Sequence, residues 1–183
     1  MMKSYFVDHP LQYTGSQLRP GWPSDAFGVD GDSIIGFVGP ASIIESTAGE
    51  EELVGDENIL ISSSMLHLII AHHEASARET MLLHRLFLSS LLEVLGTDFY
   101  RKSNHIYYQE QQLSICKIRV GHPSSAFHMG FYVKATEQLP GIIGLEDLNI
   151  SPQFFALHVM NKYVQEIRML FSTTRTQHSW IPS

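Results

Sequence analysis

Cysteine is nearly absent from this sequence of 183 residues, which contains only Cys116. A single cysteine excludes an intrachain disulfide and suits a reducing compartment. Long apolar runs are absent too, because no stretch approaches the ~20 residues that a membrane-spanning helix needs. Residues 1–10 also carry no apolar run of the length typical of a signal peptide. We therefore expect a cytoplasmic protein that has no membrane partner.

Positive charge is also scarce. Twelve Lys and Arg residues against nineteen Asp and Glu residues give a net charge of −7, so the overall field repels nucleic-acid phosphates. Basic residues pair only at Arg101–Lys102 and at Lys117 and Arg119, which does not make the basic stripe of a nucleic-acid-binding domain. Apolar residues make up 44% of the chain and charged residues 17%, which excludes a disordered chain or a coiled coil. We expect one globular domain over residues 1–183 that does not bind nucleic acid.

Strand patterns dominate the first two thirds of the chain. The first thirty residues are rich in proline and glycine, which favours surface loops after one short strand. The short, turn-rich gaps that separate the last three strand patterns indicate antiparallel hairpins. The expected strands cover residues 4–7, 33–38, 64–73, 105–108, 113–120 and 126–134.

Two helices have clear start signals. Ser76 and Glu79 form the S-x-x-E pattern of a capping box and predict a helix over residues 77–95. Ser151 followed by Pro152 predicts the start of a second amphipathic helix that continues to about residue 171. Strands grouped as hairpins, with helices separate from them, predict an α+β fold: a mainly antiparallel sheet with two main helices packed on it.

Three short segments, residues 101–107, 112–114 and 127–130, carry polar residues and glycine in a distinctive order. Together they resemble the central signature of the lipoate–biotin ligase superfamily, in which an Asn-Asp-Ile segment precedes a Lys-Leu-Ser-Gly strand and a His-Gly strand. The resemblance implies a compact ligase-like domain in which neighbouring strands line a ligand groove. The matching positions are Asn104 and Ile106, Leu113 and Ser114, and His128 and Gly130.

The sequence departs from that signature at three positions. Gln112 stands where the ligases have lysine, His105 where they have aspartate, and Ile115 where they have a second glycine. Glutamine can donate a hydrogen bond, but it cannot place a cation beside a negatively charged ligand. The Arg-rich segment with paired glycines that grips the adenylate in ligases is also missing from the N-terminal third. These departures keep open a non-catalytic binding or assembly protein with the same fold.

A closer resemblance covers nearly the whole chain. Residues 31–40, 65–72 and 84–88 are similar to blocks of an uncharacterised prokaryotic family, known only as a domain of unknown function (number three-six-six). The similarity implies a compact version of the lipoate–biotin ligase domain and implies no established reaction.

These resemblances lead to a prediction for the site. Gln112 and His128 should open onto one shared groove that binds a small carboxylate-bearing or adenylated ligand, with ATP or an acyl-adenylate as the implied cofactor. If the protein is an enzyme, acyl transfer is the expected reaction class, with His128 as acid or base, Asp32 as orienting group and Cys116 as nucleophile. The predicted ligand-binding residues are Arg101, Asn104, Gln112, Ser114, Gly130 and His67.

Histidine is abundant, with ten residues. A metal-dependent hydrolase built on His67, His72 and His84 is therefore a third hypothesis, although the chain has no H-E-x-x-H or C-x-x-C spacing. Our preferred site contains no metal. The sequence leaves a homodimer open.

Overall fold

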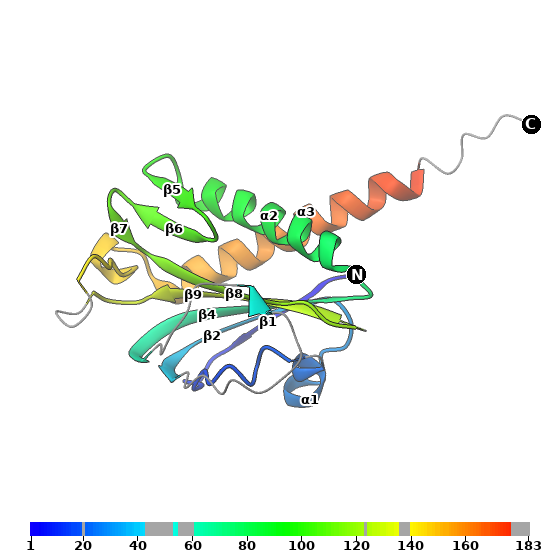
Figure 1. The fold of residues 1–183 in the computed structure, drawn as a ribbon, viewed down its shortest axis with the longest axis horizontal. Helices are drawn as coiled ribbons and strands as arrows, with labels where there is room; N and C mark the ends of the chain where they lie inside the picture. Colours follow the sequence, from blue (N-terminus) through cyan, green and yellow to red (C-terminus); the bar gives the residue numbers. More distant parts are fainter. Residues whose placement is uncertain (20, 43–52, 55–60, 123, 136–139, 177–183) are drawn as a thin grey trace, which may run out of the picture.

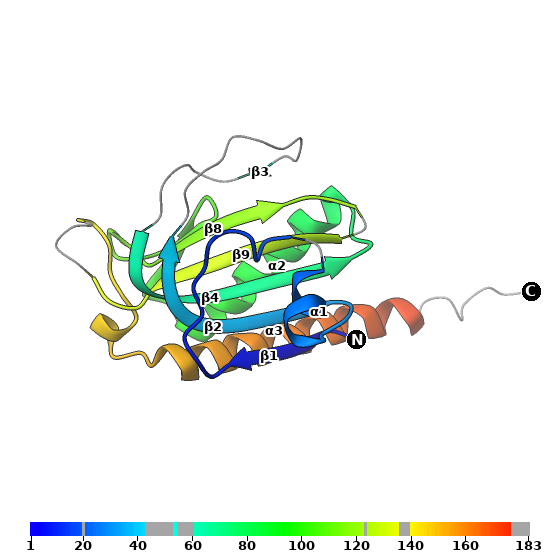
Figure 2. The ribbon, with the colours of Figure 1, turned by 90° about the horizontal axis from the view of Figure 1, so that it is seen from below.

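The computed structural model describes residues 1–19, 21–42, 53–54, 61–122, 124–135 and 140–176. Its main sheet contains β1 (Lys3–Val7), β2 (Ser33–Ser42), β3 (Leu53–Val54), β4 (Ile61–His73), β8 (Ser114–Arg119) and β9 (Ser124–Tyr132). The strands have the order β1-β2-β4-β9-β8-β3, and all neighbours are antiparallel except β1 and β2 (Figures 1 and 2). The predicted α+β fold with a mainly antiparallel sheet is confirmed.

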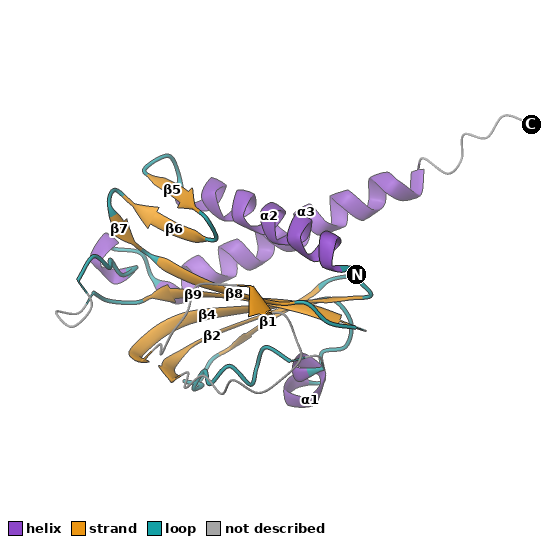
Figure 3. Cartoon of the chain, in the orientation of Figure 1, coloured by secondary structure: helices purple, strands orange, loops and turns teal. Residues whose placement is uncertain are grey.

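Two long helices, α2 (Ala77–Leu95) and α3 (Pro152–Thr176), cover one face of this sheet (Figure 3). The predicted capping box is present at the start of α2: the Ser76 hydroxyl accepts from the backbone N–H of Glu79, and the Glu79 carboxylate accepts from the backbone N–H of Ser76. Satisfying these otherwise unpaired N–H groups fixes where the helix begins. The predicted bounds of α2 are confirmed.

The main core lies between these helices and the sheet. Alternate residues of β4 and β9 point toward the helices and are completely buried, as period-two strand geometry requires. The ammonium of Lys162 on α3 forms ion pairs with Glu93 of α2 at 2.8 Å and with Glu166 at 2.9 Å, which links the two helices outside the core. The buried strand residues on this side include Leu66, Leu68, Ile70, Phe127, Met129 and Phe131.

The opposite face of the main sheet is covered by residues 8–19 and 21–32, which we call the N-terminal segment. The expectation of surface loops here is wrong in part, because this segment contains α1 (Trp22–Phe27) and buries the ring of Tyr13 completely. The backbone N–H of Tyr13 donates to the carbonyl of Pro40 at 2.8 Å, which attaches the segment to β2. Gly39 permits this close approach, since a Cβ there would lie 2.0 Å from the carbonyl oxygen of Leu11.

A second, three-stranded sheet is formed by β5 (Phe99–Lys102), β6 (His105–Tyr108) and β7 (Gln111–Gln112). Ser103 and Gln109, both with positive φ, lie in its two tight turns. The sequence predicted β6 at its observed bounds but missed β5 and β7, which are its hydrogen-bonded neighbours. The predicted hairpin of β8 and β9 is confirmed. None of the helices in the described residues is long and apolar enough to cross a membrane.

Candidate functional site

His128 lies under the N-terminal segment in a fully buried pair with His67. The His128 Nε2 and His67 Nδ1 atoms are 3.0 Å apart, and His67 Nε2 lies 3.3 Å from the carbonyl oxygen of Gly39. A carbonyl can only accept, so His67 donates from Nε2 and its Nδ1 accepts from His128. The ring of Tyr13 stacks on His128 with centroids 4.0 Å apart. This arrangement closes the pair to solvent.

Burial keeps both of these histidines neutral. It lowers the pKa of His67 to about 4, against a smaller opposing effect of the bond to Gly39. Burial also lowers the pKa of His128, and the nearby His67 and Lys117 lower it further. His128 Nδ1 has no hydrogen-bond partner among the described residues. A neutral, enclosed imidazole of this kind is poorly placed to exchange protons with a ligand.

The shared groove expected for Gln112 and His128 is wrong. His128 faces the N-terminal segment, whereas Cys116 belongs to the core on the helix side of the sheet. Ser114 and Cys116 are two positions apart in β8, so their side chains lie on the same face of the sheet. The Ser114 hydroxyl accepts from the backbone N–H of Ile106 in β6. Gln112 pairs with Tyr107 of β6, whose hydroxyl donates to Gln112 Oε1, and the Gln112 amide donates to the carbonyl of Ser114 at 2.9 Å. Gly130 and His67, which were also predicted to bind the ligand, lie on the same face of the sheet as His128.

Cys116 packs against His84 of α2, and its Sγ lies 3.2 Å from His84 Nε2. Burial raises the pKa of the thiol to about 12, although the charge of Arg85 opposes this. Burial is also the main cause that lowers the pKa of His84 to about 4. The pair is therefore a neutral thiol beside a neutral imidazole, which does not supply the thiolate that nucleophilic catalysis requires.

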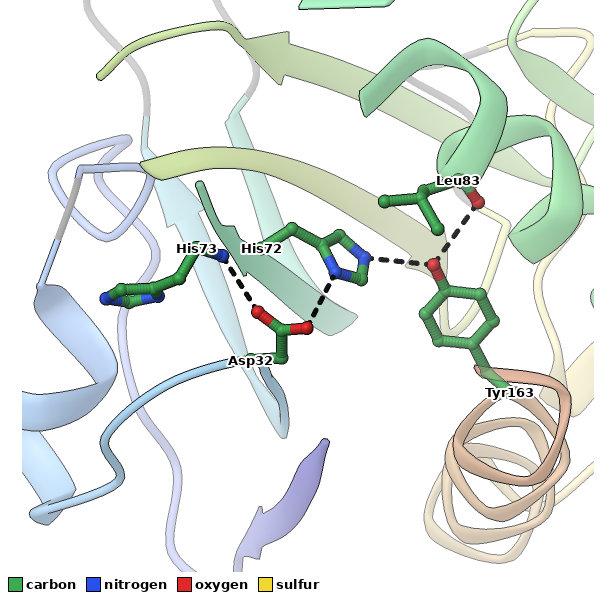
Figure 4. Close-up of polar contacts among 5 residues, drawn as sticks. All are labelled: Asp32, His72, His73, Leu83 and Tyr163. Atoms are coloured by element: carbon green, nitrogen blue, oxygen red, sulfur yellow. Dashed lines mark hydrogen bonds and ion pairs between the residues drawn. The ribbon is translucent and has the colours of Figure 1, made fainter. Parts of the chain in front are cut away.

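Asp32 lies just before β2 and contacts neither His128 nor Cys116 in the structure. Its Oδ1 accepts from the backbone N–H of His73 at 2.8 Å, and its Oδ2 lies 3.6 Å from His72 Nδ1 (Figure 4). Nε2 of His72 lies 3.0 Å from the hydroxyl of Tyr163, which donates to the carbonyl of Leu83 at 3.2 Å. A chain of contacts thus links the β2 end of the sheet to α3 and α2.

The electrostatics of this chain keep Asp32 ionised. Burial alone would raise the pKa of its carboxyl, but the contacts from His72 and His73 outweigh burial and hold the pKa below its ordinary value. The Asp32 side chain is 25% exposed and lines two adjoining cavities, of about 300 Å³ and about 550 Å³. Of the three predicted catalytic residues, Asp32 is the one that lines these two cavities.

The remaining predicted ligand-binding residues gather around the three-stranded sheet. The guanidinium groups of Arg101 and of Arg85 on α2 both donate to the carbonyl of Ser103, at 2.6 Å and 3.1 Å. Asn104 follows in the same turn, and its Oδ1 is buried without a hydrogen-bond partner in the described part of the chain. We refer to Arg85, Arg101, Ser103, Asn104 and Gln112 as the arginine site.

The three histidines of the metal hypothesis are not brought together. His67 lies on the N-terminal-segment side of the sheet, whereas His72 and His84 contact Phe127 on the helix side. Within the described residues, no group of three or more His, Cys, Asp or Glu side chains is placed to hold a metal ion. The predicted metal cluster is therefore wrong for these three residues.

Two residues that contact the predicted site residues were not predicted from the sequence. Tyr163 lies within the predicted amphipathic helix and has no local signal for its contact with His72, which is 91 positions away in the chain. Arg85 was not selected because a single arginine on a helix gives no local signal. Both residues reach the predicted site residues through contacts between elements that are far apart in the sequence.

Proteins that carry biotin or lipoate ligase names share this fold. One is the putative lipoate protein ligase Ta0514 of T. acidophilum, at 10% identity and TM-score 0.62, covering 91% of this chain and 85% of that one. Another is the biotin protein ligase of Aquifex aeolicus in complex with biotin and ATP, at 12% identity and TM-score 0.57, covering 91% and 70%. At these identities the similarity establishes the fold.

More similar proteins have no assigned reaction. A protein of unknown function from Pyrococcus horikoshi matches with TM-score 0.82 and 24% identity, over 100% of this chain and 99% of that one. The uncharacterized protein MJ0805 of Methanocaldococcus jannaschii is 27% identical over 158 residues, which are 81% of this chain and 72% of the relative. Residues 2–177 match the model of the family described as a domain of unknown function (DUF366), and the chain belongs to that family.

Proposed function

We propose that the protein binds a small carboxylate-bearing or adenylated ligand at the arginine site. The fold supports a ligand-binding role, since a neighbour with the same fold is described in complex with biotin and ATP. The position of the site also agrees with the resemblance in the sequence, because Asn104 matches the ligase signature and Gln112 stands at the position of the ligases' lysine.

The observation that carries the proposal is the convergence of two guanidinium groups. Arg85 comes from α2 and Arg101 from β5, and both reach the single carbonyl oxygen of Ser103. Two cations held side by side repel each other, and an anion bound between them removes that repulsion. Guanidinium groups bind carboxylate and phosphate oxygens with paired N–H donors. In a chain with net charge −7, such a local pair is a place where an anion can approach.

Neutral polar groups beside the arginines add specificity. Asn104 Oδ1 is a buried acceptor that has no donor among the residues that the structure describes, and a ligand hydroxyl or amino group would supply one. The hydroxyl of Tyr107 donates to Gln112 Oε1 at 3.3 Å, a long bond that holds the amide of Gln112 against β8. These contacts orient the ligand after the arginines attract it.

The proposed function is ligand binding, and it includes no covalent catalysis by Cys116. The neutral thiol of Cys116 and the enclosed ring of His128 give no support for a covalent intermediate. Acyl transfer is tested separately: if the protein activates a carboxylate with ATP, pyrophosphate is released as the acyl-adenylate forms.

Replacing either arginine should weaken binding of ATP or of a non-hydrolysable acyl-adenylate analogue by about tenfold, as expected when one charge-assisted contact is lost. Isothermal titration calorimetry on Arg85→Gln and Arg101→Gln measures this. Arg78→Gln is the matched control, because Arg78 is an exposed arginine in the first turn of the same helix. The proposal fails if the wild-type protein binds neither ligand, or if Arg78→Gln weakens binding as much as the two test variants.

Gln112→Lys should tighten binding of the same analogue by about tenfold, a gain of roughly 1.4 kcal/mol. The new ammonium would stand where the resembled ligases carry their lysine, and its attraction to a phosphate would be partly offset by desolvation. The same calorimetric titration provides the measurement, with Gln111→Lys, one position earlier and exposed, as control. Equal affinities for wild type and Gln112→Lys would place the phosphate away from this position.

A further inference from the structure

We propose that two copies of this chain associate through the outer edge of β1, so that the main sheet continues from one copy into the other across a two-fold axis. β1 is the terminal strand of this sheet, and no strand in the described residues pairs with its outer side (Figure 2). An edge of this kind offers its backbone hydrogen-bonding groups to another strand. The partner that we infer is a second copy, because the edge is complementary to itself.

The backbone of β1 bonds to β2 at alternate residues only. The N–H of Lys3 donates to the carbonyl of Asp32 at 2.9 Å, so Lys3 and Tyr5 turn their backbone groups toward β2. Ser4 and Phe6 alternate with them and turn their N–H and C=O groups outward. Residues 3–5 are exposed, so solvent reaches this edge. The outer edge of β1 therefore presents donors and acceptors in alternation.

An antiparallel pair of β1 strands centred on Tyr5 uses all of these outward groups. In this register Ser4 of one copy lies opposite Phe6 of the other, and the two residues exchange both N–H···O=C bonds. A two-fold axis repeats this exchange on its other side. Tyr5 then faces Tyr5 of the other copy at a position without backbone bonds, where side chains approach most closely. The Tyr5 ring, 45% exposed in one chain, thereby gains an aromatic neighbour.

The charges at the two ends of the strand favour the same arrangement. Lys3 is at the start of β1 and Asp8 directly follows its end, and both residues are exposed. Neither side chain forms an ion pair with another described residue. Antiparallel pairing brings Lys3 of each copy beside Asp8 of the other, whereas parallel pairing would bring like charges together. The edge thus selects a second copy in the antiparallel orientation.

The helix layer beside this edge carries little charge that would oppose the association. Helix α3 contacts β1, so in the continued sheet the two copies of α3 lie on the same face, next to the axis. The exposed residues of α3 between positions 153 and 168 include no carboxylate, although the chain has a net charge of −7. Depletion of charge is typical of the centre of an interface.

Disulfide crosslinking tests the register. Tyr5→Cys should form a covalent dimer with oxidised glutathione, because facing residues at such a position have Cα atoms about 4.5 Å apart, within the range that a disulfide spans. Ser4→Cys is the matched control, since it is also exposed but lies diagonal to Ser4 of the other copy, at about 7–8 Å. Cys116 is buried and does not compete. Mass spectrometry without reductant measures the product, and equal crosslinking of the two variants would overturn the proposal.

Analytical ultracentrifugation of the unaltered chain measures the association itself. The expected species has twice the 20.7 kDa mass of one chain. A chain that stays monomeric at about 100 µM would overturn the proposal, because the edge would then lack useful affinity for a second copy.

A charge exchange distinguishes contact between copies from an effect within one chain. Lys3→Glu should raise the dissociation constant of the dimer by about tenfold, because it places a like-charge pair on each side of the axis. Lys3→Glu combined with Asp8→Lys should restore the affinity of the wild type. The two positions lie at opposite ends of one strand, so damage to the single chain would not be reversed by the second change. Failure of the double variant to recover, with its circular dichroism unchanged, would place the interface elsewhere.

Discussion

Acidification from about pH 7.5 to about pH 5 should lower the free energy of unfolding by about 4 kcal/mol through His67 and His84 alone, a large part of the stability of a domain, and His128 adds to this loss. The cause is the three buried neutral histidines, His67, His84 and His128. Burial lowers the pKa of His67 and of His84 to about 4 and lowers that of His128 as well. In the unfolded chain the same rings bind protons near the ordinary value of 6.5.

The direction of this change in the free energy of unfolding follows from proton binding. Between the folded and unfolded pKa values, the unfolded state holds more protons, so falling pH favours unfolding. The stability contributed by each neutral ring is complete above about pH 6.5 and declines as the pH falls; for His67 and His84 the loss continues toward pH 4 and amounts to about 2 kcal/mol each at pH 5, and the loss for His128 has the same sign. Asp32 does not add to this decline, because its pKa lies below the ordinary carboxyl value and it stays ionised across the window.

Urea denaturation at a series of pH values measures the effect, and its slope gives the number of protons taken up on unfolding. His9→Gln is a suitable control, because His9 is exposed and its removal should leave the slope unchanged. A stability that stays constant between pH 6.5 and pH 5 would contradict the assignment of three neutral buried rings.

Tyr13→Ala should cost about 3–5 kcal/mol of stability, as for other large buried aromatic side chains. The Tyr13 ring is completely buried and stacks on His128 and on His67, with centroids 4.0 Å and 4.9 Å apart. Its removal would leave a void between the N-terminal segment and the sheet and would admit water to the histidine pair. Thermal and chemical denaturation at about pH 7.5 measure the loss.

Tyr13→Phe separates the ring from the hydroxyl. The Tyr13 hydroxyl is buried without a hydrogen-bond partner among the described residues, so its removal should raise stability by about 1 kcal/mol. A clear loss of stability in Tyr13→Phe would show that the hydroxyl is bonded in solution and would reassign its role.

Local signals explain which elements were predictable. Helix α2 was predicted at its observed bounds because Ser76 and Glu79 determine its start through bonds within four residues. Helix α1 was missed because its six residues follow a glycine and a proline-rich stretch, and the tertiary packing of Trp22 stabilises it. Propensity is a weak guide where tertiary contacts decide.

The error in the site has a different cause. In one continuous strand the side chains of Gln112 and Ser114 would lie on the same face. The strand is interrupted at Leu113, between β7 and β8, so this alternation does not hold. The groove prediction also left out the N-terminal segment, whose contact with His128 spans more than a hundred positions. The contact between His72 and Tyr163 spans 91 positions, so no local pattern could have indicated it.

The N-terminal segment is fastened to the sheet at both ends, because β1 and β2 are parallel neighbours and the chain between them crosses the sheet surface (Figure 2). A loop anchored in this way cannot swing on a hinge. Uncovering His67 and His128 requires the segment to lift from the sheet between its two anchors, with the loss of the backbone hydrogen bonds that Leu11 and Tyr13 form with β2. Access to that side of the protein therefore depends on local opening of this segment, whose free-energy cost is set by the segment's own packing and hydrogen bonds.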